Sequence, residues 1–478
     1  MLKTVKKLRL DRLISAKPCR EGDIIVAVIV ARICEPDSKL AMTRWWDTTT
    51  LPELLDLEGV DEDDIYKAMD WLLARQKRIE KKLAKRHIKE SDMVLYDLTS
   101  SYFEGVTCPL ARLGKSRDRK RNTLQINYGI VSTKEGCPIS VSVYEGNTGD
   151  PSTLIDQANK VRDDFGINEI VLVGDRGMIT QKQINELREM GSFDWITAMK
   201  TGGIRKLVAG GALQLDLFDE RNLFEFMHPD YPDERLVACR NAALGRKRAH
   251  KRESMLQATK EELSKIRASL QKGTLRRTER TADKIGVRVG KVVNKYKMAK
   301  HVELRIEDNR FDFEFNEESI ESEAALDGVY VVRTSLPKEK IDADETVRSY
   351  KNLTNVERAF KSLKSIDLMV RPIRHRTEDR VRSHIFLAML TYYVQRAMRE
   401  TLRPLLFADE DQEAKKTRDP VDPAKRSEEA LKKTRTKTID DATVAHSFKT
   451  LLHHMSTITR DICIQKIAGA ADTTFSID

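Results

Sequence analysis

The sequence lacks the long apolar stretches and the cysteine patterns that mark several large classes of protein. No run of about 18 apolar residues occurs, so no membrane-spanning helix is expected. The basic segment Met1–Leu10 has neither an apolar centre nor a cleavage site, which argues against a secretion signal. The six cysteines contain no Cys-x-x-Cys pair, so they predict neither a zinc site nor a disulfide framework. We therefore expect a protein of the reducing cytoplasm.

Several nucleotide-binding and catalytic motifs are also missing. The chain contains no Gly-x-x-x-x-Gly-Lys-[Ser/Thr] loop and no Gly-x-Gly-x-x-Gly turn, which removes two common kinds of nucleotide-binding site. Its nine histidines include no His-Glu-x-x-His pair. His375 and His384, near the last long predicted helix, are expected to form local hydrogen bonds rather than to bind a metal. Aromatic residues make up only 6% of the chain, and Trp195 is expected in the core more than on a displaced base.

Charge, by contrast, is abundant and unevenly distributed. Charged residues make up 33% of the sequence, and the formal net charge is +10. Residues 241–300 carry eighteen Lys/Arg and five Asp/Glu, so their surplus of 13 positive charges exceeds that of the whole chain. A solvated surface would explain a smaller surplus. One this large over one stretch favours contact with phosphates, and we assign Arg276, Arg277 and Lys291 to DNA binding.

The spacing of apolar residues predicts an α/β protein with added segments. Residues 1–90 read as helical, 91–200 as the first part of an α/β core, and 201–345 as a basic, strand-rich insertion with one long helix. Residues 346–405 complete the core, and 406–478 hold a mobile linker (408–437) and a last helix. Expected strands are 93–97, 124–132, 139–144, 169–175, 193–199, 234–239, 302–306, 311–315 and 328–334. Expected helices are 23–32, 61–88, 151–165, 181–190, 249–271, 350–364, 380–402 and 441–455.

Three acidic residues stand in unusual positions in this pattern. Asp97 and Asp175 each close a predicted buried strand, and sheets of this kind place ligands at the carboxyl ends of their strands. Glu357 lies in the predicted helix 350–364, where Tyr350 and Lys364 share its stripe at about 100° per residue. Three converging carboxylates need a cation to remain ionised. Oxygen ligands alone suit Mg²⁺ or Mn²⁺, and two such ions can promote in-line displacement at phosphorus.

Each of these acids also has an ordinary structural interpretation. An Asp at the end of a strand is commonly a turn residue or a helix cap. Glu357 can pair with Lys361 on the surface of an amphipathic helix. The functional interpretation is favoured because three such acids recur in one chain.

Several longer motifs resemble one group of bacterial insertion-sequence transposases of the DDE type. Tyr350-x2-Leu353-x3-Glu357-x6-Lys364 resembles their Tyr-x2-Arg-x3-Glu-x6-Lys signature. The segments around their two catalytic aspartates and after the glutamate are matched in the same order. These segments are 96–105, 145–150, 174–178 and 371–385.

This resemblance implies a ribonuclease H-like core interrupted by a strand-rich insertion before its last acid. It implies that Asp97, Asp175 and Glu357 are catalytic and hold the metal, and that Tyr350 and Lys364 contact DNA. Leu353 departs from the signature, which has an arginine there. The neighbouring cations Arg358 and Lys361 are candidates for contacting DNA, as is Arg176 in the turn after the fourth strand, although a turn arginine is as often merely solvated.

The resemblance further implies cut-and-paste movement of an element bounded by terminal inverted repeats. The partner would be double-stranded DNA, both the element's ends and the target, and the mechanism favours a homodimer on DNA. The helical region 1–90 would then serve DNA binding or dimerisation. Two alternatives stay open: a metal-dependent nuclease that only hydrolyses DNA, and a non-catalytic DNA-binding protein derived from a transposase.

Overall fold

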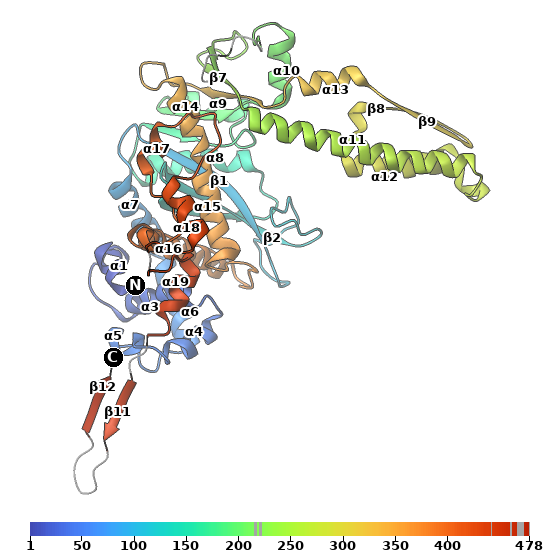
Figure 1. Ribbon diagram of the computed structural model, residues 1–478. Coiled ribbons are helices and arrows are strands. Elements are labelled where there is room, and N and C mark those ends of the chain that lie inside the picture. The colour runs from blue at the N-terminus through green and yellow to red at the C-terminus, as the bar shows by residue number, and fades with distance from the viewer. Residues whose placement is uncertain (215–217, 219–221, 441, 459–460, 466–472, 478) are drawn as a thin grey trace.

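The computed structural model describes residues 1–214, 218, 222–440, 442–458, 461–465 and 473–477 (Figure 1). Its centre is an eight-stranded mixed sheet in the order β3-β2-β1-β4-β5-β10-β7-β6. The first three strands form an antiparallel meander, β1, β4 and β5 are parallel, and the last three are antiparallel to their neighbours. The strands are β1 Met93–Tyr102, β2 Gln125–Thr133, β3 Pro138–Glu145, β4 Ile170–Val173, β5 Phe193–Ala198, β6 Leu223–Phe226, β7 Arg235–Arg240 and β10 Val329–Thr334.

This sheet confirms the predicted α/β class with a ribonuclease H-like mixed sheet. The insertion also extends it, because β10, β7 and β6 all come from residues after 200 and continue the sheet beyond β5. Helices α8 Asp150–Asn159 and α9 Gln181–Met190 connect the parallel strands.

The helical N-terminal region packs against the sheet and against one long central helix. Helix α16, Glu378–Thr401, is buried along nearly its whole length because apolar residues surround its axis. It contacts α3 and α6 on one side and β3 on another. A single buried apolar cluster runs from Val5 to Leu451, so these helices share the core of the sheet. They are α1 Leu2–Lys7, α2 Leu10–Ile14, α3 Arg20–Cys34, α4 Lys39–Trp46, α5 Leu51–Leu55, α6 Glu62–Leu73 and α7 Gln76–His87.

The insertion also forms an arm that projects away from the body (Figure 1). Helix α11, Ala242–Gln271, runs outward beside α12, Ala282–Tyr296, and the hairpin of β8, Val302–Glu307, and β9, Arg310–Phe315, lies along them. The arm has an apolar core of its own. All four strands expected in the insertion are present. Helices α10 Thr201–Ala209, α12 and α13 Glu317–Ala324 were not predicted, so the insertion contains more helix than expected.

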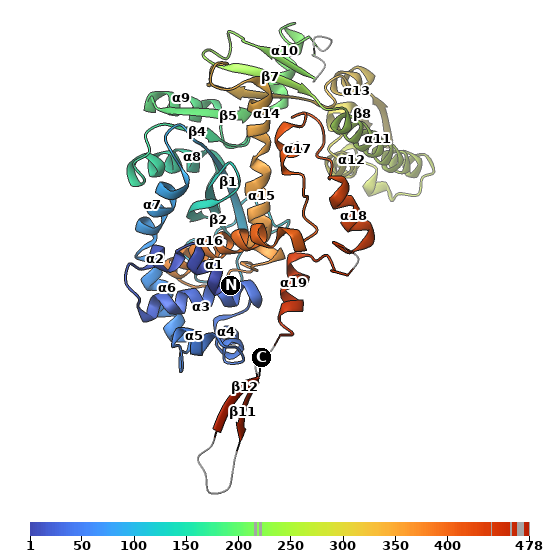
Figure 2. The same cartoon turned by 60° about the vertical axis from the view of Figure 1, so that its left-hand side comes forward.

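Three predicted elements need their boundaries corrected. Strand β1 continues to Tyr102, because Ser100 and Ser101 are buried with hydrogen-bond partners, so Asp97 lies inside the strand and not at its end. The helix expected at 61–88 divides into α6 and α7. The helix expected at 350–364 divides into α14 Ala343–Lys351 and α15 Leu353–Lys361, followed by a wide π-helical turn at Ser362–Ile366. Figure 2 shows α14 and α15 as a nearly continuous column beside β1.

The C-terminal segment is more ordered than its composition predicts. Residues 408–437 contain α17, Gln412–Thr417, and α18, Glu428–Thr436, instead of a structureless linker. The predicted last helix begins later, as α19, Phe448–Met455, because bridges to Thr438 and Leu406 hold 444–446 extended. Residue 441, its expected start, is outside the described residues. A hairpin of β11 Asp461–Gln465 and β12 Thr473–Ile477 follows, which was not predicted. No helix in the described part of the chain is long and apolar enough to cross a membrane.

Candidate active site

The two aspartates of the candidate site lie on neighbouring parallel strands. Leu95 on β1 pairs with Val173 on β4, so continuing that register by two residues brings Asp97 level with Asp175. Adjacent strands are roughly 4.8 Å apart, which brings the two carboxylates into electrostatic range. Asp97 is half-buried and accepts a hydrogen bond from the Leu98 amide at 2.8 Å.

Asp175 is held by the turn that follows β4. Its Oδ1 accepts hydrogen bonds from the amides of Gly177 and Met178, both at 2.8 Å. These bonds are those of a tight Asx-type turn, so Asp175 is also a structural turn residue, as an Asp at the end of a strand commonly is. The carboxylate is nevertheless exposed, and its other oxygen is available to a ligand.

Helix α15 brings the third acid to the same place. Val356, Ala359 and Phe360 are buried against the sheet, and the Phe360 ring meets Tyr128 of β2 edge-on at 5.9 Å. Asn355 donates a hydrogen bond to the carbonyl of Lys134 at 2.8 Å and so fixes the helix to the β2–β3 turn. This packing leaves Glu357 exposed.

All three acids line one cleft of about 750 Å³ between the sheet and the base of the arm. Tyr350 and Leu353 of the signature-like helix line it too, as does Arg176. The arm contributes cationic side chains to the opposite wall. The cations that line the cleft are Arg176, Arg205, Arg248, Lys251, Arg252 and Lys351.

The pKa of Asp97 reflects this crowding. Burial raises it to about 7, and repulsion from Asp175 and Glu357 adds to the increase. The Leu98 amide and the positive charge of Arg117 act in the opposite direction. Asp97 therefore exchanges a proton near neutral pH, as expected where several carboxylates share one site.

Tyr350 is the phenol of this cleft. Burial raises its pKa to about 12, and the negative charges of Asp175, Glu357 and Asp97 contribute in the same direction. Its hydroxyl is therefore protonated at neutral pH and available to donate a hydrogen bond to an oxygen of a ligand.

The donor chemistry of the cleft fits a hard divalent cation. Among the described residues, no three or more acidic, histidine or cysteine side chains are gathered closely enough to hold a metal ion as they stand. However, three carboxylates from separate elements face one cleft and repel one another. A cation would relieve that repulsion, and oxygen ligands suit Mg²⁺ or Mn²⁺. Small movements of Asp175 or Glu357 would be needed to complete its ligand set.

Lys364 lies apart from the other signature residues. The wide turn at Ser362–Ile366 rotates its side chain out of register with Tyr350 and Glu357, and it is buried instead of lining the cleft. Its Nζ binds Asp118 Oδ1 at 2.9 Å, and Arg371 pairs with the same oxygen.

The remaining cations predicted to bind DNA are all on the surface. Arg358 and Lys361 are exposed on α15, but neither is among the described residues that line the cleft. Arg276 and Arg277 lie in the turn between α11 and α12, and Lys291 lies on α12, all three exposed. Trp195 is buried, as expected of a core residue.

Sequence patterns did not single out several residues near the site. Arg117 pairs with Asp150 and lowers the pKa of Asp97. It belongs to a loop with five cations between 115 and 121, a run of charge that could have drawn attention to it. Arg205 and Lys251 are exposed on the cleft wall, and only the basic surplus around Lys251 gave any signal.

Comparisons with known proteins place the chain in a family. No curated protein matches it. Among solved structures, it matches a piggyBac transposase synaptic complex with hairpin DNA, determined by cryo-EM, with 9% identity and a TM-score of 0.38 over 91% of this chain and 86% of that one. The family model described as "Transposase DDE domain" matches residues 106–394, more than half of the chain. The chain therefore belongs to the family of transposases that carry this DDE domain.

Proposed function

We propose that this chain is the transposase of a bacterial insertion sequence, which cleaves the ends of that element and joins them to target DNA. Family membership supports a transposase. The observation that carries the more specific proposal is the single cleft lined by Asp97, Asp175 and Glu357, with Tyr350 beside them. The matched solved protein is a transposase in complex with hairpin DNA, consistent with a DNA partner for this chain.

In the proposed reaction, hydrolysis of a phosphodiester at the element's end frees a 3′-hydroxyl, which then attacks a phosphodiester of the target. Asp97, Asp175 and Glu357 would hold Mg²⁺ or Mn²⁺, in two sites, and these ions would stabilise charge on the attacking and leaving oxygens. Tyr350 and Arg176 line the same cleft and are placed to hold phosphate oxygens by hydrogen bonds.

The partner in this proposal is double-stranded DNA in the cytoplasm. The exposed cations of the arm would contact its backbone without reading sequence, because phosphate contacts carry no direct sequence information. Lys364 would contact DNA only after leaving Asp118. Since both ends must be cut together, the active assembly would be a homodimer that holds two ends.

The test is a pair of assays with duplexes that carry the inverted repeats flanking the reading frame, in Mg²⁺. Cleavage releases a 3′-hydroxyl end, and a pre-cut end is then offered to plasmid DNA. We expect both activities in the native chain and a loss of about 10³-fold or more in Asp97→Asn, Asp175→Asn and Glu357→Gln. Glu58→Gln, an exposed acid with no partner among the described residues, is the control.

The outcomes separate the three functions. Cleavage without joining would show a nuclease instead of a transposase. DNA binding without either activity, unaffected by Asp97→Asn, would show a DNA-binding protein that has lost catalysis. Joining that survives all three acid substitutions would place the catalytic site elsewhere.

A further inference from the structure

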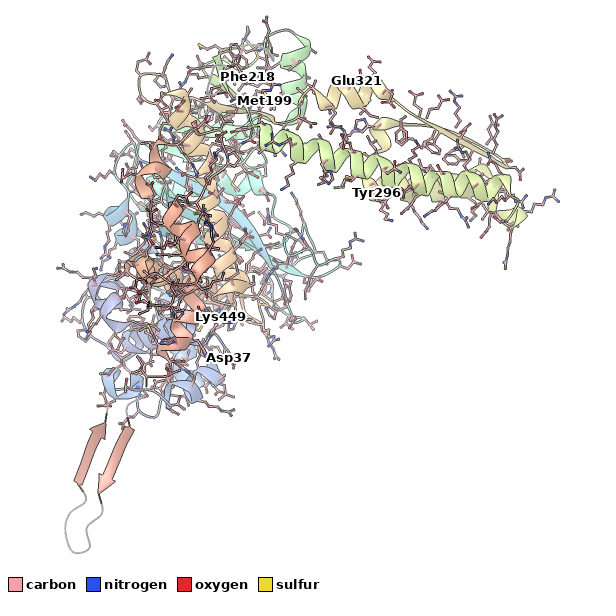
Figure 3. The ribbon with its side chains drawn as sticks, in the orientation of Figure 1. Asp37, Met199, Phe218, Tyr296, Glu321 and Lys449 are labelled. Carbon is pink, nitrogen blue, oxygen red and sulfur yellow. The ribbon has the colours of Figure 1, made fainter. Side chains whose placement is uncertain are left out.

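Four side chains that can carry positive charge lie within electrostatic range of one another at the end of the molecule opposite the arm. Arg32 lies in the last turn of α3, Lys39 begins α4, His375 precedes α16 and His384 lies within it. Arg32, Lys39 and His384 are only 2%, 5% and 7% exposed, and the centres of the two imidazole rings are 4.8 Å apart. Asp37, which Figure 3 labels, marks this region. We call the four residues the seam cluster; none of them lines the catalytic cleft.

No acid neutralises the seam cluster. Within the described part of the chain, neither Arg32 nor Lys39 has a hydrogen bond or an ion pair through its side chain. Arg32 Nε and His384 Nδ1 are buried without a hydrogen-bond partner, while the other ring nitrogen of His384 lies 3.3 Å from the Val370 carbonyl.

The acids nearby are already engaged or point outward. Asp70 pairs with Arg380 at 2.9 Å, and that guanidinium also lies over the Tyr66 ring. Asp37 is exposed and accepts a hydrogen bond from the Ser38 amide at 2.6 Å. The seam cluster is therefore a buried group of side chains that can become cationic, and no acid among the described residues pairs with it.

The pKa of every member of the seam cluster is lowered. Burial lowers the pKa of Lys39 to about 7, and the charge of Arg32 lowers it further. Burial likewise lowers the pKa of His375 to about 3, with Lys39, Arg32 and Arg380 contributing. A buried charge is costly unless an opposite charge pairs with it. Lys39 also occupies the first turn of α4, where the helix dipole disfavours a cation and favours an anion.

We propose that the seam cluster binds one phosphate group. A guanidinium presents two parallel N–H donors that match a phosphate, and a lysine adds a third charge-assisted bond. Arg32, Lys39 and His384 are buried and His375 is half-buried, so the seam cluster suits a single phosphate group more than a length of duplex. The group can be free phosphate or one phosphate of a DNA backbone, and both have the same chemistry at the site.

The first experiment uses inorganic phosphate and the full chain without DNA. Phosphate should raise the melting temperature above that in chloride of equal ionic strength, and titration calorimetry should give a saturable heat. Lys39→Met should fold at least as well as the native chain, because it removes an unpaired buried charge, yet bind phosphate about tenfold more weakly or worse. Lys82→Met, on the exposed side of α7, should bind as the native chain does. Asp97→Asn should also bind normally, which separates this site from the catalytic cleft.

The second experiment distinguishes the two sources of phosphate. Binding of a labelled duplex is measured over a series of salt concentrations. If one DNA phosphate occupies the site, Lys39→Met should reduce the slope of log affinity against log salt by about 1. If the slope is unchanged while phosphate binding is lost, the ligand is free phosphate. If Lys39→Met and His375→Gln alter neither phosphate binding nor the salt slope, the proposal is wrong.

Discussion

Asp118 shows how one buried residue organises the surroundings of the cleft. Its side chain is 1% exposed and pairs with both Lys364 and Arg371, while Oδ2 accepts a hydrogen bond from the Tyr102 amide at 3.0 Å. It therefore joins the β1–β2 loop, the end of the α15 segment and the strand that carries Asp97. Removing one partner of a buried ion pair costs far more than breaking an exposed pair, because the remaining charge is left buried without compensation.

We expect Asp118→Asn to lower the free energy of unfolding by about 2–4 kcal/mol, because two cations would remain without their carboxylate. Urea unfolding followed by circular dichroism measures the change. Asp163→Asn removes an exposed acid whose partner among the described residues is its neighbour Arg162, and it should leave the free energy of unfolding nearly unchanged. Equal effects of the two substitutions would show that Asp118 has no special role.

Lys39 predicts an unusual dependence of stability on pH. Its pKa is about 7 in the folded chain, below the ordinary value of 10.5. Between these values the unfolded chain binds more protons at this position, so the free energy of unfolding should rise with pH. The groups that face Lys39 are Arg32, His375 and His384.

In phosphate-free buffer, Lys39 should raise the free energy of unfolding of the native chain by of the order of 1–2 kcal/mol between pH 7 and pH 9. Lys39→Met should lose that gain, and Lys82→Met should keep it. At each pH, the free energy of unfolding of each variant is compared with that of the native chain, because other groups titrate over the same range. An identical profile for Lys39→Met would refute the assignment.

Individual catalytic candidates were easier to predict than their supporting residues. Asp97, Asp175 and Glu357 stood out because each follows or interrupts an apolar pattern. Asp118 and Arg117 did not, because their partners at positions 364, 371 and 150 come from distant parts of the chain. The seam cluster was not predicted either, because its members also come from distant parts of the chain. Its histidines were expected only to form local hydrogen bonds.

At the scale of elements, the arm combines a local core with a charged exterior. Leu263, Ile285 and Val289 are fully buried between its helices, so it holds its shape away from the body. Figure 3 labels Tyr296 on this arm, where its hydroxyl bonds Glu262 at 2.6 Å. Arg276 and Arg277, between α11 and α12, are exposed and can contact a polyanion.

Replacing Arg276, Arg277 and Lys291 together by Gln should weaken duplex binding and reduce the salt slope by up to about 2.7. The melting temperature should not change, because all three side chains are exposed. Fluorescence anisotropy over a salt series measures the slope. The matched control removes three exposed cations from the C-terminal segment, Lys425, Lys432 and Arg435. If the arm variant had the same salt slope as the native chain, or if the control reduced the slope equally, the result would count against DNA contact by the arm.

Elements with strong periodicity were predicted well, and those decided by tertiary contacts were not. Helix α16 and seven of the eight strands of the sheet were predicted, from short apolar runs, alternation or helical spacing, whereas β6 was not. The end of β1 was missed because its last residues are polar and become buried only through partners such as Tyr128. Helix α12 was missed because the surrounding charge hid its buried residues Ile285, Val289 and Val293.

At the scale of the whole molecule, the C-terminal segment belongs to the main core. Val421, Phe448 and Leu451 are buried in the cluster that includes the sheet. The carbonyl of Val421 also accepts a hydrogen bond from Lys351 at 3.1 Å, which connects the segment to a residue of the cleft. Residues 408–437 were predicted to be a mobile linker because they are rich in Lys, Glu, Asp, Ala and Pro, whereas Phe448 and Leu451 lay in the predicted last helix.

A chain that stops after residue 405 should therefore lose of the order of 5 kcal/mol of stability, from three apolar side chains at about 1.5–3 kcal/mol each. A chain that stops after residue 458 keeps all three and should melt near the native temperature. Differential scanning fluorimetry compares the two truncations. Equal melting temperatures would mean that the segment contributes little to the fold.

Strand β1 has hydrogen-bonded neighbours on both sides, so its carboxylate cannot shift without breaking the centre of the sheet. The two acids that meet it sit on a turn and on a helix, and that helix ends in a wide turn whose coil can tighten. Any closing of the site must therefore come from the turn that carries Asp175 or from α15, each moving toward a fixed strand. Lys364 lies in the wide turn that follows α15, so an advance of that helix would also act on the ion pair between Lys364 and Asp118.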